Sequence, residues 1–292
     1  MEEGIGLIGF GEAGRTLAVA GDWAARLRVY DIQTDSAELR QAKLSEYRAA
    51  GIDGRDSLSE ALDRATVVLS MVTADEALAA ACAAAPVIRA GALYCDFNSV
   101  APQSKRNAAT AIQAAGAHYV DVAMMAPVQP GNLGVPLLIS GPQADLAASS
   151  LTALGFSNAR VVGNGIGRAS SIKMVRSVVV KGIEALTIEA MLAAEVAGVR
   201  DEVIASLDAS ETRAGWADRA DYNLDRMMVH GLRRAAEMQE VVKTLEGLGV
   251  AAVMTGGTVR RQYEIGRLGL KGPCPGLAGK LERIGAELGR QA

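Results

Sequence analysis

The sequence predicts an α/β fold, in which a doubly wound parallel sheet is followed by an all-α C-terminal domain. Three observations predict it. A G-x-G-x-x-G turn follows the first apolar run, strand and helix patterns alternate over the first half of the chain, and the remainder carries helical patterns alone. We therefore expect two domains, residues 1–164 and 165–292, in line with the rule of about 150 residues per domain.

The turn at the start of the chain has the features of a dinucleotide site. Residues 4–8 form a short apolar run, typical of a strand, and Arg15 continues into a helical pattern. Glycines between a strand and a helix let a pyrophosphate approach the backbone N–H groups and the positive end of the helix dipole. The candidate cofactor-binding residues of this turn are Gly9, Phe10, Gly11, Glu12, Ala13 and Gly14.

Asp31 supports this interpretation. It ends a plausible second strand, residues 27–31, and lies 20 residues after Gly11, where an acid that binds the adenosine ribose is expected. Its carboxylate would accept hydrogen bonds from the ribose hydroxyls and repel a 2′-phosphate, and residues 32–35 contain no arginine to neutralise one. We therefore expect the cofactor to be NAD rather than NADP.

Further strands and helices alternate as far as residue 162, which predicts crossover units and a Rossmann sheet with helices on both faces. In such a sheet the ligand lies beyond the carboxyl ends of the strands. The predicted strands 66–72, 92–97 and 117–122 therefore point to residues at or after their ends. The candidates are Val72, Thr73 and Asn98 for the cofactor, and Ser99 and the loop after Val122 for the substrate.

The composition excludes several kinds of partner. A net charge of −3 gives no electrostatic footprint for nucleic acid or for an anionic membrane, and no uncharged apolar stretch reaches about 18 residues. Three widely spaced cysteines and two histidines predict neither a disulfide framework nor a metal site. We expect a small-molecule substrate, no metal and, because no export signal is visible, a cytoplasmic location.

The longest helical pattern runs from Arg168 to about Ala197 and is apolar on nearly every side, so most of it should be buried. Lys173, Ser177 and Glu184 form one polar stripe on it, within about 40° on a helical wheel. A lysine one turn after the sheet domain can move the proton of a substrate hydroxyl, but it could equally pair with Glu184 or extend to solvent. Lys173 is the candidate acid/base, and Ser177 its helper.

From residue 1 to about 200 the chain resembles the β-hydroxyacid dehydrogenases, the family of 3-hydroxyisobutyrate and 6-phosphogluconate dehydrogenases. The resemblance rests on the N-terminal glycine turn, on Asn98-Ser99 followed by Pro102, on a loop that opens on Asp121, and on a glycine-rich turn before Lys173. It implies that Lys173 is the catalytic acid/base. It also implies that Asn98 and Ser99 lie against the nicotinamide and the substrate, and that the loop after Asp121 holds a substrate carboxylate.

Two departures leave the substrate open. Where the family has D-A-P-V-S-G-G, residues 121–131 are D-V-A-M-M-A-P-V-Q-P-G, and Ser177 replaces an asparagine. Met124 and Met125 are candidate substrate contacts that suit a bulkier or uncharged substrate. Our first interpretation is an NAD-dependent dehydrogenase acting on a hydroxy acid or the matching carbonyl compound. The alternatives are an imine or carbonyl reductase of the same architecture and a non-catalytic cofactor-binding protein, which would not need Lys173.

The C-terminal half adds two expectations. The run that starts at His230 resembles a divergent, little-characterised branch of the superfamily. There Arg234, with Arg233 and His230, could complete a carboxylate or phosphate site, or could belong to a solvated helix face paired with Glu237 and Glu240. The long apolar helix, together with a family whose C-terminal helices pack against a second subunit, predicts a homodimer.

Overall fold

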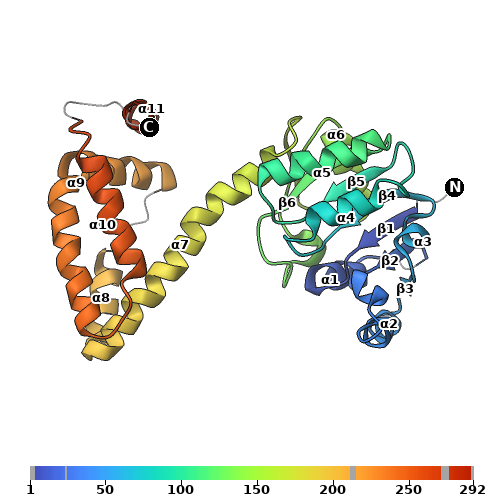
Figure 1. Ribbon diagram of the computed structural model, residues 1–292, viewed down its shortest axis with the longest axis horizontal. Helices are drawn as coiled ribbons and strands as arrows, with labels where there is room; N and C mark the ends of the chain where they lie inside the picture. The colour runs from blue at the N-terminus through green and yellow to red at the C-terminus, as the bar shows by residue number, and fades with distance from the viewer. Residues whose placement is uncertain (1–3, 24, 211–214, 271–275, 291–292) are drawn as a thin grey trace. The chain divides into compact units, whose positions relative to one another are not determined.

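The computed structural model describes residues 4–23, 25–210, 215–270 and 276–290. The chain divides into two compact units, residues 1–178 and 179–292, and this division falls inside helix α7 (Arg168–Ala197). The boundary that we predicted, between residues 164 and 165, lies just before the same helix. The predicted fold class, a doubly wound sheet followed by helices, is confirmed (Figure 1), although the sheet is mostly rather than wholly parallel.

The first unit is built on an eight-stranded sheet with the strand order β3-β2-β1-β4-β5-β6-β7-β8. The strands are β1 (Gly4–Ile8), β2 (Leu27–Tyr30), β3 (Asp53–Gly54), β4 (Ala65–Ser70), β5 (Leu93–Asp96), β6 (His118–Met124), β7 (Leu137–Ser140) and β8 (Ala159–Gly163). The first six run parallel, whereas β7 is antiparallel to β6 and β8 is parallel to β7.

The sheet differs from the prediction at its two edges. We did not predict β3 or β7, and we expected every strand to be parallel. The reversal at β7 has a local cause: the connection after β6 contains only the 3-10 turn η2 (Asn132–Gly134), so the chain has no crossover helix and turns back beside β6. A hydrogen bond of 2.8 Å from Met125 N–H to the Pro136 carbonyl closes the base of this loop.

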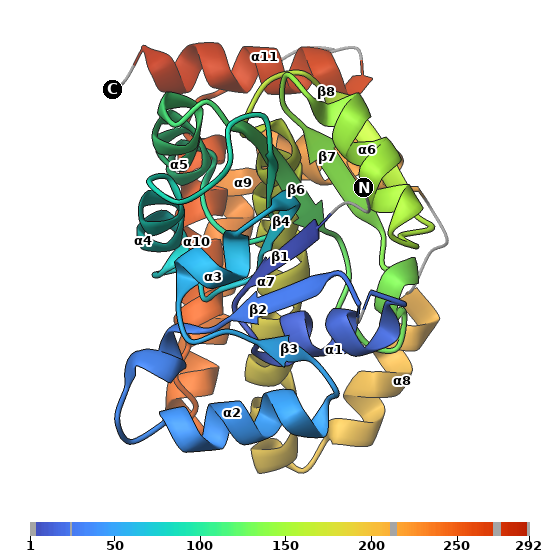
Figure 2. The same cartoon turned by 90° about the vertical axis from the view of Figure 1, so that its right-hand side faces the viewer.

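Helices cover both faces of the sheet and make two separate hydrophobic cores. On one face α1 (Glu12–Ala20), α2 (Arg40–Ala49, reached through the 3-10 turn η1, Ile32–Asp35) and α6 (Ala144–Ala153) bury Leu17, Tyr47 and Leu151. On the other, α3 (Leu58–Leu62), α4 (Ala77–Ala84) and α5 (Pro102–Ala114) bury Leu62, Ala81 and Ile112. Figure 2 shows α4 and α5 on one side of the strands and α1 and α6 on the other. The carboxyl ends of the parallel strands are thereby left for a ligand.

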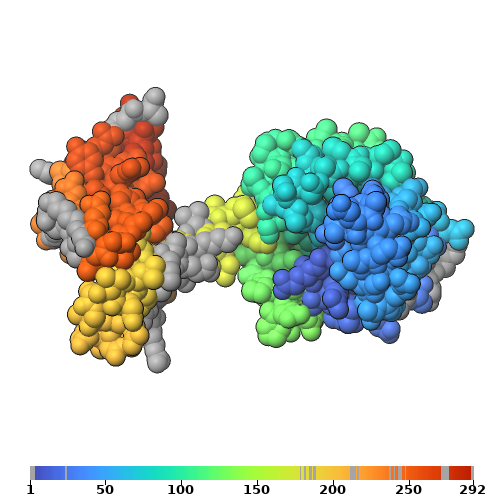
Figure 3. Space-filling model, turned by 60° about the horizontal axis from the view of Figure 1, so that its bottom comes forward, coloured from blue at the N-terminus to red at the C-terminus, as the bar shows by residue number. Residues whose placement is uncertain are grey.

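The second unit is helical throughout its described residues. It contains the C-terminal part of α7 and four further helices: α8 (Arg200–Ser210), α9 (Trp216–Gly247), α10 (Val253–Gly266) and α11 (Gly276–Gly289). Together they form a compact unit (Figure 3). The backbones of α9 and α10 approach closely where Gly231 meets Gly266, since a Cβ on Gly231 would lie 2.7 Å from the Cα of Gly266. On α11 the buried Lys280 pairs with Asp221 at 2.9 Å and Asp225 at 2.7 Å, which fixes α11 to α9.

We expected most of α7 to be buried, and within a single copy of the chain this expectation is wrong. Seven large apolar side chains are exposed along it, and the first five recur every three or four residues: Ile172, Val175, Val179, Ile183, Leu186, Leu192 and Val196. Such spacing places the first five on one face of the helix, and Val175 is 71% exposed. No helix in the described part of the chain is long and apolar enough to cross a membrane.

Glu189 joins α7 to α10 inside the second unit. Its buried carboxylate accepts hydrogen bonds from the backbone N–H groups of Met254 (2.7 Å) and Thr255 (2.8 Å) and from the Thr255 hydroxyl (2.5 Å). The two N–H groups belong to the first turn of α10 and have no acceptor within the helix. Burial by itself raises the pKa of the Glu189 carboxyl, but the bonds from Thr255 and Met254 outweigh burial and lower it.

We predict that Glu189→Ala lowers the free energy of unfolding of the helical unit by about 1–3 kcal/mol, because it leaves the start of α10 without its acceptor. Because the folded pKa is lowered, the wild-type contribution is fully present above the unfolded value of about 4.3 and is lost as the pH falls through the folded value. Urea unfolding at neutral and acidic pH measures both effects. Glu195→Ala on the same helix is the control, since Glu195 makes only an exposed ion pair with Arg200. Equal losses of unfolding free energy in both variants would contradict the role of Glu189 as the acceptor for the first turn of α10.

Candidate active site

A cavity of about 530 Å³ lies beside the N-terminal glycine turn. Seven of the predicted cofactor-binding residues line it: Gly9, Gly11, Glu12, Ala13, Asp31, Val72 and Thr73. Apolar side chains from α3, from α4 and from the residues after β4, among them Leu58, Met71 and Ala80, form another part of its wall. Polar side chains also line it, namely Gln33, Lys43 and Glu76. An elongated ligand with an apolar ring at one end and anionic groups at the helix terminus would suit this lining.

The glycines of the turn have different tasks. Gly9 has φ +93°, and a Cβ on it would lie 2.3 Å from the Met71 carbonyl oxygen. A Cβ on Gly14 would lie 2.3 Å from the Gly9 carbonyl oxygen, so this glycine lets α1 start close to β1. Around Gly11, by contrast, there is no atom within 4 Å of a Cβ position, and its φ of −77° suits any residue. The backbone at Gly11 is therefore open to a ligand, as a bound pyrophosphate requires.

Asp31 connects the glycine turn to the end of β2. Its Oδ2 accepts the Phe10 N–H at 2.7 Å, and its Oδ1 accepts the Gln33 N–H at 3.0 Å. Each oxygen keeps further lone pairs for a ribose hydroxyl. The Phe10 ring is buried against Tyr47, with ring centroids 5.0 Å apart, so Phe10 takes part in the turn through its backbone.

Lys43, on α2, lines the same cavity and was not predicted. Its buried ammonium group donates to the Phe10 carbonyl at 3.3 Å and pairs with Glu46 at 2.7 Å. It also lines a second cavity of about 860 Å³ that extends from the glycine turn past Thr16 to Gln129. The sequence could not predict this buried position, because a single lysine in a charged helical pattern looks like any exposed lysine of a helix.

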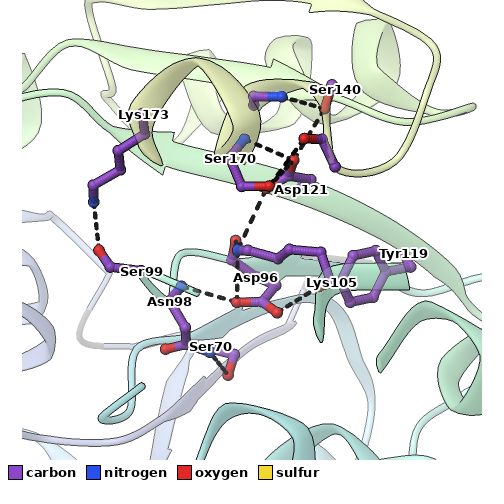
Figure 4. A network of polar contacts seen from close by, with 12 residues as sticks. Ser70, Asp96, Asn98, Ser99, Lys105, Tyr119, Asp121, Ser140, Ser170 and Lys173 are labelled. Carbon is purple, nitrogen blue, oxygen red and sulfur yellow. Dashed lines mark hydrogen bonds and ion pairs between the residues drawn. The ribbon is translucent and has the colours of Figure 1, made fainter. Parts of the chain in front are cut away.

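Polar residues form a row across four neighbouring strands. The register pairs Ser70 of β4 with Asp96 of β5, Asp96 with Asp121 of β6, and Asp121 with Ser140 of β7. All four side chains are buried, and they lie where β4, β5 and β6 approach their carboxyl ends (Figure 4). Lys105 reaches this row from α5, with its ammonium group 3.0 Å from Asp96 Oδ1 and 3.4 Å from Asp121 Oδ1.

The row holds Asn98 in place. The Asp96 carboxylate accepts the Asn98 N–H at 2.8 Å, and the Asn98 side chain donates to Ser70 Oγ at 3.1 Å and accepts the Val72 N–H at 2.7 Å. Asn98 is therefore buried behind the cavity of about 530 Å³, which we call the candidate cofactor cavity, and it positions Val72 in the wall of that cavity. Ser99, the next residue, is exposed.

The row also holds the start of α7. Asp121 Oδ2 accepts the Ser170 N–H at 3.0 Å and its hydroxyl at 3.1 Å, and Ser140 Oγ accepts the Ala169 N–H at 3.0 Å. One turn further along, Lys173 donates from its ammonium group to Ser99 Oγ at 2.5 Å (Figure 4). The two residues predicted from separate stretches, Ser99 and Lys173, are thus brought together.

The other predicted residues lie in several environments. Ser177 donates its hydroxyl to the Lys173 carbonyl at 2.9 Å, within α7. Met124 is half-buried against the sheet core, and Met125 packs in a small cluster with Ala169 at the start of α7. Arg234 is half-buried on α9 in the second unit. The side chains of Glu184, Glu237 and Glu240 lie outside the described part of the structure.

Sequence reasoning missed the buried cluster formed by Asp96, Lys105 and Asp121. We treated Asp121 only as the start of the substrate loop, and we did not single out Lys105. One signal was present: two predicted neighbouring strands each carried an aspartate near the carboxyl end. Two carboxylates at adjacent strand ends need a cation when they are buried.

The different environments of Gly11 and Gly14 give a paired prediction. Gly11→Ala should leave the unfolding temperature unchanged, because the methyl group meets no protein atom, but should weaken NAD binding at least about tenfold by covering the open backbone. Gly14→Ala should lower the unfolding temperature itself, because its Cβ meets the Gly9 carbonyl. Calorimetric titration with NAD and thermal unfolding separate the two effects. Unchanged NAD affinity in Gly11→Ala would show that the pyrophosphate does not lie at this turn.

Comparison with known proteins agrees with this geometry. Residues 4–153 match the family described as the NAD binding domain of 6-phosphogluconate dehydrogenase, and residues 194–265 match a domain of unknown function, DUF1932. An uncharacterised protein of Methanothermus fervidus is 24% identical over 250 residues, which cover 86% of this chain and 94% of that protein.

Solved structures extend the comparison. A conserved hypothetical protein from Sinorhizobium meliloti is 36% identical over 98% of this chain and 97% of its own, with a TM-score of 0.61. A conserved protein of unknown function, described as structurally similar to 3-hydroxyacid dehydrogenases, is 30% identical over 91% of this chain and 99% of its own, with a TM-score of 0.57. An imine reductase from Myxococcus stipitatus, solved with NAD+, shares the fold at 18% identity over 97% of this chain and 99% of its own, with a TM-score of 0.72. The chain therefore belongs to the family that has the NAD-binding domain of 6-phosphogluconate dehydrogenase, and with it to the NAD(P)-dependent oxidoreductases.

Proposed function

We propose that this chain is an NAD-dependent dehydrogenase that acts on a hydroxy acid, or on the matching carbonyl compound, with Lys173 as the acid/base. One observation carries the proposal. The ammonium group of Lys173 lies 2.5 Å from Ser99 Oγ, and Ser99 directly follows Asn98, which is bonded to Val72 in the wall of the candidate cofactor cavity. An acid/base must be within hydrogen-bond reach of the oxygen whose proton it moves, and Ser99 and Lys173 together can hold such an oxygen.

We assign a separate role in binding or proton transfer to each of these residues. Backbone N–H groups at the start of α1 bind the pyrophosphate, and Asp31 accepts bonds from the adenosine ribose. When bound, the nicotinamide supplies the chemistry that the chain lacks, accepting or giving a hydride. In oxidation Lys173 would act as the neutral amine and take the proton of the substrate hydroxyl, becoming an ammonium group; in reduction the ammonium group would return that proton. Ser99 holds the same oxygen through its hydroxyl, which already bonds to Lys173.

Reduction of an imine or an uncharged carbonyl compound is the second candidate. It is favoured by the loop that follows Asp121, where the serine and glycines of the family motif are not evident and Met125 packs among apolar side chains. An apolar lining binds a bulky uncharged group better than a carboxylate. A screen of hydroxy acids, carbonyl compounds and imines, read by absorbance of the reduced nicotinamide, distinguishes these substrates. No turnover with any of them, with NAD bound, would favour a non-catalytic cofactor-binding protein.

Lys173→Ala tests the acid/base directly. It should lower kcat by at least about a hundredfold and leave the Kd for NAD within a few-fold, because general acid–base catalysis contributes typically 10²- to 10⁴-fold. Ser177→Ala should lower kcat by only about tenfold, since it removes one hydrogen bond, to the Lys173 carbonyl, and no charge.

Arg176→Ala is the control for these variants, because its side chain is exposed one turn further along the same helix. Steady-state kinetics and NAD titration should show near wild-type values for it. If Arg176→Ala abolished turnover and Lys173→Ala did not, the acid/base would have been assigned to the wrong residue.

We also propose that NAD is preferred over NADP. Asp31 presents a carboxylate at the ribose end of the cavity, and the ammonium group of Lys43 is already paired with Glu46. The Kd for NAD should be at least tenfold lower than that for NADP, and Asp31→Asn should narrow this ratio by about tenfold because it removes the negative charge. Equal affinity of the wild-type chain for both cofactors would contradict this role of Asp31.

The exposed apolar side chains of α7 support a homodimer. A row of aliphatic groups on one helix face is the kind of surface that a second copy covers in an isologous contact. Light scattering at micromolar concentration should give twice the mass of one chain, and Val175→Asp should shift it towards the monomer. Leu146→Asp, at an exposed leucine of α6, should not. A wild-type monomer would refute the proposal.

A further inference from the structure

We propose that the buried cluster of Asp96, Lys105 and Asp121 is a positioning device that sets the distance between Lys173 and Ser99. The inference rests on the proposed function, because it concerns the same acid/base. None of the three residues touches the candidate cofactor cavity, and each would act through residues bonded to it. They are positioning residues for catalysis.

The burial of the cluster makes its geometry rigid. Lys105, Asp96 and Asp121 are each 0% exposed. A charge without water must be paired and hydrogen-bonded, so departures from this arrangement are strongly disfavoured. Lys105 donates to the Asp96 carbonyl at 2.7 Å and to its carboxylate at 3.0 Å, and the Tyr119 hydroxyl donates to the other carboxylate oxygen at 2.5 Å. Burial, and the Asp96 charge beside it, raise the pKa of Tyr119, so this phenol stays a donor.

One arm of the cluster leads to Ser99. The oxygen of Asp96 that receives Lys105 also accepts the Asn98 N–H at 2.8 Å. This bond fixes the turn between β5 and α5 at the residue before Ser99. Lys105 itself belongs to α5, which begins three residues after Ser99, so both ends of the turn are fastened to the same carboxylate.

The other arm leads to Lys173. Asp121 faces Lys105 with Oδ1 and uses Oδ2 to accept the N–H and the hydroxyl of Ser170. This N–H group lies in the first turn of α7, where backbone N–H groups have no acceptor within the helix, so Asp121 fixes where the helix begins. Lys173 lies three residues after Ser170, on the next turn.

Lys105 is therefore the element that the two arms share. It lies between the carboxylates of two adjacent strands, whose negative charges would otherwise repel each other without solvent screening. Removing it should change both arms together, so the Lys173–Ser99 distance should change although neither residue has been altered. A shift of about 1 Å at a reacting group can lower a rate by about a hundredfold.

Lys105→Met tests this. We expect kcat to fall by about ten- to hundredfold with the Kd for NAD within a few-fold, and hydrogen exchange of the Ala169 and Ser170 amides to accelerate. Adding Asp121→Asn should restore part of kcat, because the amide removes the repulsion and its oxygen still accepts the Ser170 N–H. A merely structural role predicts the opposite, since a second buried substitution would lower activity further.

The chain offers a matched control in Lys280→Met. Lys280 is also a buried lysine between two aspartates, but it lies in the helical unit and fastens α11 to α9. We expect it to lower thermal stability, as Lys105→Met does, while kcat stays near the wild-type value. If both variants lost kcat equally, the effect of Lys105→Met would be general destabilisation and the positioning proposal would be wrong.

A milder variant covers the case in which Lys105→Met does not fold. Ser170→Ala removes one hydrogen bond to Asp121 and no charge, and should lower kcat several-fold with NAD binding unchanged. Unchanged kcat in Ser170→Ala and in any folded Lys105→Met would overturn the proposal, provided that Lys173→Ala is inactive. If Lys173→Ala keeps full turnover, the proposed function itself fails, and the two failures are thereby distinguished.

Discussion

The arrangement of the candidate site depends on the burial of charge at the ends of two adjacent strands. The sheet register sets Asp96 beside Asp121, and a hydrophobic environment does not tolerate two carboxylates without a counter-charge. Lys105 supplies that charge from α5. Two elements that border the site are attached to this cluster: the turn that carries Ser99, and the start of the helix that carries Lys173.

The glycine turn depends on a different constraint, the contact distance between backbone atoms. Gly9 and Gly14 are needed because the protein itself leaves no space for a Cβ, whereas Gly11 leaves an open surface. Asp31 links this turn to β2 through the Phe10 N–H. The binding surface that we propose for the dinucleotide is thus made by the backbone, and backbone N–H groups at a helix start can hold a pyrophosphate without a basic patch.

Local patterns were sufficient for most of the fold. The glycine spacing and the alternation of strands and helices predict the parallel strands other than β3. The proline-free stretch from Arg168 predicts α7, and the bounds of α7 match the prediction. The local patterns did not predict β7, because its direction depends on a connection that contains no helix. They did not predict the exposure of α7 either, because the apolar pattern of a helix does not show whether its own chain or another one buries it. Lys43 and Lys105 were missed for the same reason: their burial follows from contacts between elements distant in sequence.

The central claim is that the reacting end of the cofactor meets the Lys173–Ser99 pair, and a crystal structure with NAD bound tests it most directly. The account predicts that the nicotinamide C4 lies within roughly 7 Å of the Lys173 ammonium nitrogen, close enough for one substrate carbon and its oxygen to bridge them. A nicotinamide ring in the second cavity instead, beside Thr16 and Gln129, would contradict it.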